Sequence, residues 1–185
     1  MSLPLPAPTT AVVPPALAAA VDLLAERGWH GLRLDAVAAR AGVPVLQLQA
    51  EWPSLSHLVA AAVAGLPVVV DRGDTGSTAG DLAAALEHWG RPLGRGELAV
   101  AAVAEAAGGD GVLRAGVEAA VGDAVEELVC AVGARARARG EALSGARQQW
   151  VTAVLGGVVW ERITGRGRPV PEARRAELVA SVLAA

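Results

Sequence analysis

The stretch that decides the fold is VAARAGV, residues 37–43, where an apolar helix meets a glycine and a second short helix begins. Gly42 has no Cβ, so it can take the positive φ that a tight turn between two crossed helices requires. Apolar residues on both sides of such a glycine are typical of a helix-turn-helix. We therefore expect one helix to end at Ala41 and another to begin near Val45.

The spacing of apolar residues predicts further helices on both sides of this helix-turn-helix; together they form what we call the head. A helix over residues 16–27 has its apolar stripe at Leu17, Ala20, Val21 and Leu24. The helix after the turn has its buried face at Val45, Leu48 and Trp52. A fourth helix is expected to start at residues 53–54. Helices this short bury little area alone, so they must share one small core.

These residues resemble the DNA-binding domain of the tetracycline-repressor (TetR) family. The resemblance rests on AAVDLLAERG at residues 19–28 and on Val37, Ala38, Ala41, Gly42, Val43, Leu48, Trp52 and Leu58. It continues more loosely through DTGS at residues 74–77, RARGE at 137–141 and WER at 160–162. It therefore spans nearly the whole chain.

The resemblance implies an all-α, homodimeric transcriptional regulator, and a repressor in particular. Its third helices would enter the major grooves of a palindromic operator in double-stranded DNA, and a small apolar effector would bind the C-terminal domain. The expected domains are a disordered arm (1–13), a three-helix helix-turn-helix head (14–53) and a helical ligand-binding and dimerisation body (54–185), with about nine helices in all. The predicted DNA-binding residues are Arg33, Arg40, Pro44, Val45, Gln47, Gln49 and Ser54.

The head departs from the family pattern where family members usually contact phosphate. Gln49 stands in place of a tyrosine, Leu55 in place of a lysine, and Asp35 and Glu51 add negative charge. All 16 basic residues of the chain are arginines, none lies between residues 40 and 72, and the net charge is -3. Because DNA affinity comes largely from neutralised phosphates, we expect weak, salt-sensitive binding. The alternative is a head that no longer binds DNA on a body that binds a small molecule or a protein.

The body is expected to contain five helices after a loop over residues 66–79. They span residues 80–89, 97–107, 112–139, 144–164 and 171 onward. In the third of these the inward positions are Val117, Val121, Val125, Leu128 and Val132. The helix over 144–164 is apolar on nearly every side, so it must be covered on both sides, one of them by a second subunit.

Two groups of body residues are candidates for binding. The predicted ligand-binding residues are His88, Trp89, Val121, Val125, Trp150 and Val154, and packing is an equally good interpretation for the large ones. The predicted dimer-interface residues are Trp150, Leu155, Gly156, Val159, Leu178 and Val182. Arg135, Arg137 and Arg139 either form an anion-binding patch or, as we favour, stabilise a helix C-terminus.

The sequence does not support a metal-binding, disulfide-rich, enzymatic or membrane protein. The three histidines share no metal-ligand spacing and Cys130 is the single cysteine, so neither a metal site nor a disulfide framework is expected. No phosphate-binding glycine motif is present, and nothing indicates an enzyme or a cofactor. No apolar stretch reaches transmembrane length and the first 13 residues lack a basic, apolar leader, so a cytoplasmic protein with no membrane partner is expected.

Overall fold

The computed structural model describes residues 12–141, 143–165 and 167–184. Every regular element in these ranges is helical, which confirms the all-α fold class. The α-helices are α1 (Val13–Arg27), α2 (Leu34–Ala41), α3 (Val45–Glu51), α4 (Leu55–Ala64), α5 (Thr78–Glu87), α6 (Arg95–Ala104), α7 (Gly111–Glu118), α8 (Ala124–Ala138), α9 (Gly145–Thr164) and α10 (Glu172–Ala184). The predicted arm falls almost wholly outside the described residues.

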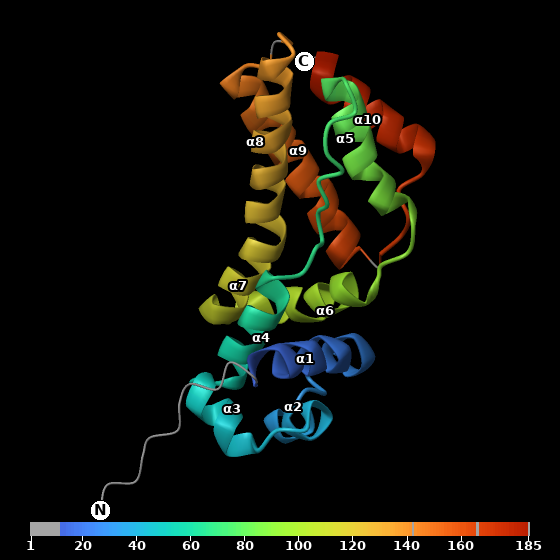
Figure 1. Ribbon diagram of the computed structural model, residues 1–185. Coiled ribbons are helices and arrows are strands. Elements are labelled where there is room, and N and C mark those ends of the chain that lie inside the picture. The colour runs from blue at the N-terminus through green and yellow to red at the C-terminus, as the bar shows by residue number, and fades with distance from the viewer. Residues whose placement is uncertain (1–11, 142, 166, 185) are drawn as a thin grey trace, which may run out of the picture.

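The direction of the helices changes along the length of the molecule (Figure 1). The head of α1, α2 and α3 lies at one end, α6 and α7 run across the middle, and α5, α8, α9 and α10 stand upright beyond them. Helix α4 packs on both α1 and α7, and α6 packs on both α1 and α9. The head and the body therefore share a continuous apolar core rather than a flexible linker.

Helix α1 buries more than the single stripe that its spacing predicts. Ala20 and Leu24 are buried as expected, but Leu17 and Val21 are only half-buried. The other buried residues of α1 are Ala16, Ala19 and Leu23. The difference arises because α1 is covered by α2 of the head and also by α4 and α6.

The long helix predicted over residues 112–139 is helical throughout, but it is not one regular α-helix. A π-helical turn, Ala119–Asp123, separates α7 from α8. The five predicted inward residues, from Val117 to Val132, are all buried. A π turn inserts one residue into the helical repeat, and it allows one apolar face to follow two different sets of neighbours: α4 beside α7, then α5 and α9 beside α8.

Candidate functional site

The turn between α2 and α3 has the geometry that its sequence predicts. Gly42 adopts φ 69° and ψ 30°, and its N–H donates to the carbonyl groups of Ala38 and Ala39. A Cβ on Gly42 would meet no atom within 4 Å, so the backbone conformation, not crowding, requires glycine here. Pro44 then caps α3 in an extended conformation, and its carbonyl accepts the N–H of Gln47 at 3.0 Å.

Helix α3 presents a largely uncharged exposed face. Leu48 alone is buried, whereas Val45 is exposed and Trp52 is half-buried, so the predicted buried face of this helix is wrong at Val45. The helix is short and rests on the head through one leucine, which leaves the rest of its surface open. The exposed side chains on α3 are Val45, Leu46, Gln47, Gln49, Ala50 and Glu51. Glutamine amides donate and accept, as readout of adenine in a major groove requires.

The two arginines predicted to bind DNA differ in their surroundings. The side chain of Arg33 is 78% exposed, and its Nε lies 3.4 Å from the Asp35 carboxylate. Arg40 instead makes a bidentate pair with Glu26 of α1, at 3.0 and 2.9 Å. The hydrogen bond from Arg40 holds the pKa of the Glu26 carboxyl below its usual value. Arg40 is therefore already neutralised within the head.

Ser54 has a local structural role that its position before α4 explains. Its Oγ accepts the backbone N–H of His57 at 3.4 Å and lies 2.8 Å from Nδ1 of the same histidine. It is exposed and caps α4. Pro44, Val45, Gln47 and Gln49 are all exposed on α3 and its N-terminal cap, but Gln47 and Gln49 are two positions apart and so point to different sides of the helix. Arg33, Arg40 and Ser54 lie at the ends of the neighbouring helices.

Family models match both parts of this architecture. The family described as "Bacterial regulatory proteins, tetR family" matches residues 16–62, which include the turn at Gly42. A second, described as "Tetracyclin repressor-like, C-terminal domain", matches residues 72–182.

The chain belongs to the TetR family.

Solved structures have the same fold as this TetR-family chain. A TetR-family transcription regulator is 25% identical, with 94% of this chain and 97% of that one covered and a TM-score of 0.67. A protein from Rhodococcus sp. assigned to the same family is 21% identical, with 91% and 95% covered and a TM-score of 0.66. The multidrug binding protein EbrR, complexed with imidazole, is 21% identical, with 92% and 93% covered and a TM-score of 0.64. No curated protein sequence matches the chain.

Members of this family are transcription regulators, with a DNA-binding N-terminal domain and a ligand-binding C-terminal domain. This assignment confirms the expectation that the protein is a regulator rather than an enzyme. In the described part of the chain, no helix is long and apolar enough to cross a membrane. The same residues contain no group of three side chains that could hold a metal ion.

The residues predicted to bind ligand are divided among several elements. Trp89 is buried, and its carbonyl accepts the N–H of Val170 at 2.8 Å. Val121 and Val125 are buried along the π turn and α8, and Val154 is half-buried on α9. Trp150, by contrast, is 52% exposed. These residues do not line any of the three cavities described for the chain.

His88 belongs to a buried polar cluster and not to an apolar wall. Its Nε2 lies 3.5 Å from a carboxylate oxygen of Glu97 and 2.7 Å from a guanidinium nitrogen of Arg91. Burial lowers the pKa of His88, and the charge of Arg91 adds to this although Glu97 opposes it. Its imidazole is therefore neutral at pH 7.

The predicted dimer-interface residues fall into two classes. Leu155, Val159 and Val182 are buried within the chain itself, as is Leu178, so the subunit covers them without a partner. Gly156 is half-buried. The exposed side of α9 carries a different stripe, formed by Ala146, Trp150, Ala153, Gly157, Trp160 and Thr164. Trp150 and Trp160 are 52% and 45% exposed, which is unusual for the largest apolar side chain.

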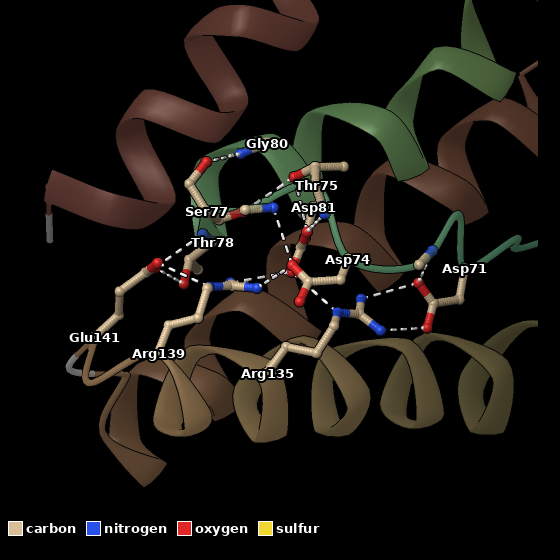
Figure 2. A network of polar contacts seen from close by, with 12 residues as sticks. Asp71, Asp74, Thr75, Ser77, Thr78, Gly80, Asp81, Arg135, Arg139 and Glu141 are labelled. Atoms are coloured by element: carbon tan, nitrogen blue, oxygen red, sulfur yellow. Dashed lines mark hydrogen bonds and ion pairs between the residues drawn. The ribbon is translucent and has the colours of Figure 1, made fainter.

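A polar network that the sequence interpretation missed joins the loop before α5 to the end of α8 (Figure 2). Asp81 is 1% exposed, and its carboxylate accepts from Arg135 at 3.0 Å and from Arg139 at 3.1 Å. Arg135 also pairs with Asp71 at 2.8 and 2.9 Å. The helix-dipole role that the sequence favours for Arg135 and Arg139 is therefore not their main role, because both pair with carboxylates about 60 residues earlier in the chain.

Proposed function

We propose that this TetR-family protein is a homodimeric repressor that binds a palindromic operator through α2 and α3. The observation that carries the proposal is the left-handed turn at Gly42, followed by an α3 whose Gln47 and Gln49 are exposed. Helix N-termini and amide side chains supply the contacts to phosphates and base edges. Because Arg40 is paired with Glu26, Arg33 is the main cation of this surface, so affinity should be modest and depend on salt.

The second subunit would cover the exposed stripe of α9. Trp150 and Trp160 lie on one side of this helix with small residues between them, which would let another helix approach closely. A second copy of this chain is the occupant we propose, since a two-fold axis beside α9 would place two heads on one operator. Trp150 thus remains a proposed interface residue. Leu155, Val159, Leu178 and Val182 would support the interface from beneath.

We propose that a small, largely apolar molecule bound in the C-terminal domain changes DNA affinity. EbrR, of the same fold, is described as a multidrug binding protein and has been crystallised with imidazole, proflavin and ethidium. Two sets of residues are proposed for such a ligand. One consists of His88, Trp89, Val121, Val125, Trp150 and Val154. The other is the mainly apolar cavity of about 560 Å³ between α5 and α10, whose walls include Ala83, Ala176, Val179 and Leu183.

The test is an unbiased selection on DNA. Purified protein is incubated with sheared DNA from its own genome at low salt, and the bound fragments are sequenced. Enrichment of a palindromic site supports the proposal; no enrichment from a folded dimer refutes it. On an enriched site, Gln47→Ala should change sequence preference, whereas Arg33→Ala should reduce the dependence of affinity on salt. Arg137→Ala, an exposed arginine on α8, is the matched control.

The pairing of Arg40 with Glu26 favours one alternative function. Asp35 beside Arg33 and exposed Glu51 further reduce the positive charge of the head. In this alternative the head no longer binds DNA, and the body binds a small molecule or a protein. Ligand-dependent thermal stabilisation together with an empty DNA selection would support it.

A further inference from the structure

A cavity lies at the junction of α9, α10 and the loop between them. It has a volume of about 590 Å³. Its walls combine apolar side chains with charged ones. The wall includes Val158, Arg162, Arg168, Val170, Arg174 and Leu178.

Arg162 is buried at the wall of this cavity with an unused hydrogen-bond donor. Its side chain is 2% exposed. Nη1 donates to the carbonyl of Trp89 at 3.3 Å, and Nη2 donates to Glu97 at 3.1 Å. Nε is equally buried, yet no atom of the described residues accepts its hydrogen. A buried guanidinium N–H without an acceptor is unfavourable, so a ligand that supplies an acceptor there would bind well.

The carboxylate of Glu97, which pairs with Arg162, also accepts hydrogen bonds from other donors. Glu97 also accepts the N–H of Gly94 at 2.7 Å and pairs with Arg91 at 3.0 Å. One carboxylate therefore faces two guanidinium groups, Arg91 and Arg162. Two guanidinium groups against one carboxylate leave this cluster with an excess positive charge.

Two further arginines, Arg168 and Arg174, line the same cavity and are exposed to solvent. Arg174 lies 3.3 Å from Glu177, a surface pair in which both side chains are more than half exposed. Among the described residues of the cavity wall, Glu161 is the single carboxylate, against three arginines. The charge of the wall thus favours an anion over a cation of similar size.

We propose that this cavity binds a small organic carboxylate with an apolar body. Its carboxylate accepts from Arg168 or Arg174 and, after a small movement of the Arg162 side chain that exposes Nε, from Arg162 as well. Its hydrocarbon part packs on Val158, Val170 and Leu178. This is a second site, separate from the residues proposed above for an apolar effector. Arg162 binds Glu97 of α6, and α6 packs on α1 of the head, so occupancy of the cavity has a short route to the DNA-binding surface.

The test is calorimetric titration of the full-length dimer with benzoate and with benzamide, its neutral isostere, at constant ionic strength. We expect benzoate to bind at least about tenfold more tightly than benzamide, because the neutral amide cannot form an ion pair with a guanidinium group. Equal binding of the two compounds, or no binding of benzoate, hexanoate or acetate, would overturn the proposal. Tighter binding of inorganic phosphate than of the carboxylates would overturn the assignment of a carboxylate ligand.

Variants at the exposed arginines locate the site without disturbing the core. The double variant Arg168→Gln, Arg174→Gln should weaken benzoate binding by about tenfold or more, with unchanged thermal stability. Arg137→Gln on α8 removes an equally exposed arginine outside the cavity and should leave binding unchanged. Arg162→Lys keeps a cation opposite Glu97 but removes Nε, and should also weaken binding. Unchanged benzoate affinity in the double variant would overturn the proposal.

Discussion

Asp81→Asn replaces the central carboxylate of the network in Figure 2 with an amide of the same shape. Oδ1 of Asp81 accepts both the N–H and the hydroxyl of Thr75, at 2.7 and 2.8 Å. Oδ2 accepts from Arg135 and Arg139 at 3.0 and 3.1 Å. All four surrounding groups donate hydrogen bonds. An asparagine must therefore turn its NH₂ group toward a donor on one side or the other.

The loss in the free energy of unfolding depends on which ion pairs each neighbouring arginine retains after the substitution. Removing one partner of a buried ion pair costs about 3–5 kcal/mol when the other charge is left alone. Here Arg135 keeps Asp71, and Arg139 keeps Asp74 and Glu141. We therefore expect the free energy of unfolding to fall by about 2–3 kcal/mol, which is roughly one charge-assisted hydrogen bond. For a chain of this size that is a decrease of roughly 4–12 °C in Tm.

The pH dependence of the difference gives an independent check. Burial acts to raise the pKa of Asp81, but hydrogen bonds from Thr75, then Arg135 and Arg139, outweigh it and hold the pKa well below its usual range. A lowered folded-state pKa means that the stabilisation is complete above the unfolded pKa and is lost as pH falls through the folded pKa. The gap between wild type and Asp81→Asn should therefore be constant from about pH 5 to 8 and narrow only in stronger acid.

Urea unfolding followed by circular dichroism, at one fixed protein concentration, measures this difference. Asp123→Asn is the control, since Asp123 is exposed and makes no ion pair within the described residues. It should change the free energy of unfolding by less than about 0.5 kcal/mol. If Asp81→Asn were equally mild, or if its effect grew toward acid pH, the network would not stabilise the fold as argued.

Three further changes test the head and the dimer. Glu26→Gln releases the guanidinium that it binds on α2, so the log–log salt slope of DNA binding should steepen by about 0.9 for each subunit, as measured by fluorescence anisotropy. Gly42→Ala should lower the free energy of unfolding by about 1 kcal/mol because its φ is positive, whereas Gly65→Ala, at a negative φ, should cost less in the same urea titration. Trp150→Ala combined with Trp160→Ala should convert the dimer to monomers in sedimentation velocity without unfolding the subunit, since both side chains are already half exposed.

Much of the fold was predictable because its signals are local. The turn needs a residue that can adopt φ 69°, and Gly42 between two short apolar segments is enough to predict it. The inward face from Val117 to Val132 repeats every three or four residues, so the pattern survives even the π turn that interrupts the helix. Local sequence therefore predicts both the head and the longest helical run of the body.

The features that sequence could not predict depend on distant partners. Asp81 binds arginines at positions 135 and 139, and Glu97 binds Arg162, with no periodic pattern linking them. The apolar surface of α9 posed a related problem. Spacing shows that the helix is apolar all round, but not that Leu155 and Val159 face the core of the same subunit while Trp150 and Trp160 face outward.

The position of α6 explains how events in the body can reach the head. On one side α6 packs on α1, and Arg95 at its start pairs with Asp22 of that helix. On the other side Glu97, two residues later, is bound by Arg162 of α9. Both contacts lie in the first turn of the ten-residue helix α6, so a shift of Arg162 would act on the same turn that contacts α1. On the proposed palindromic operator the two α3 helices of a dimer would have to match grooves one helical turn of DNA apart, about 34 Å, so a small rotation of each head would change affinity.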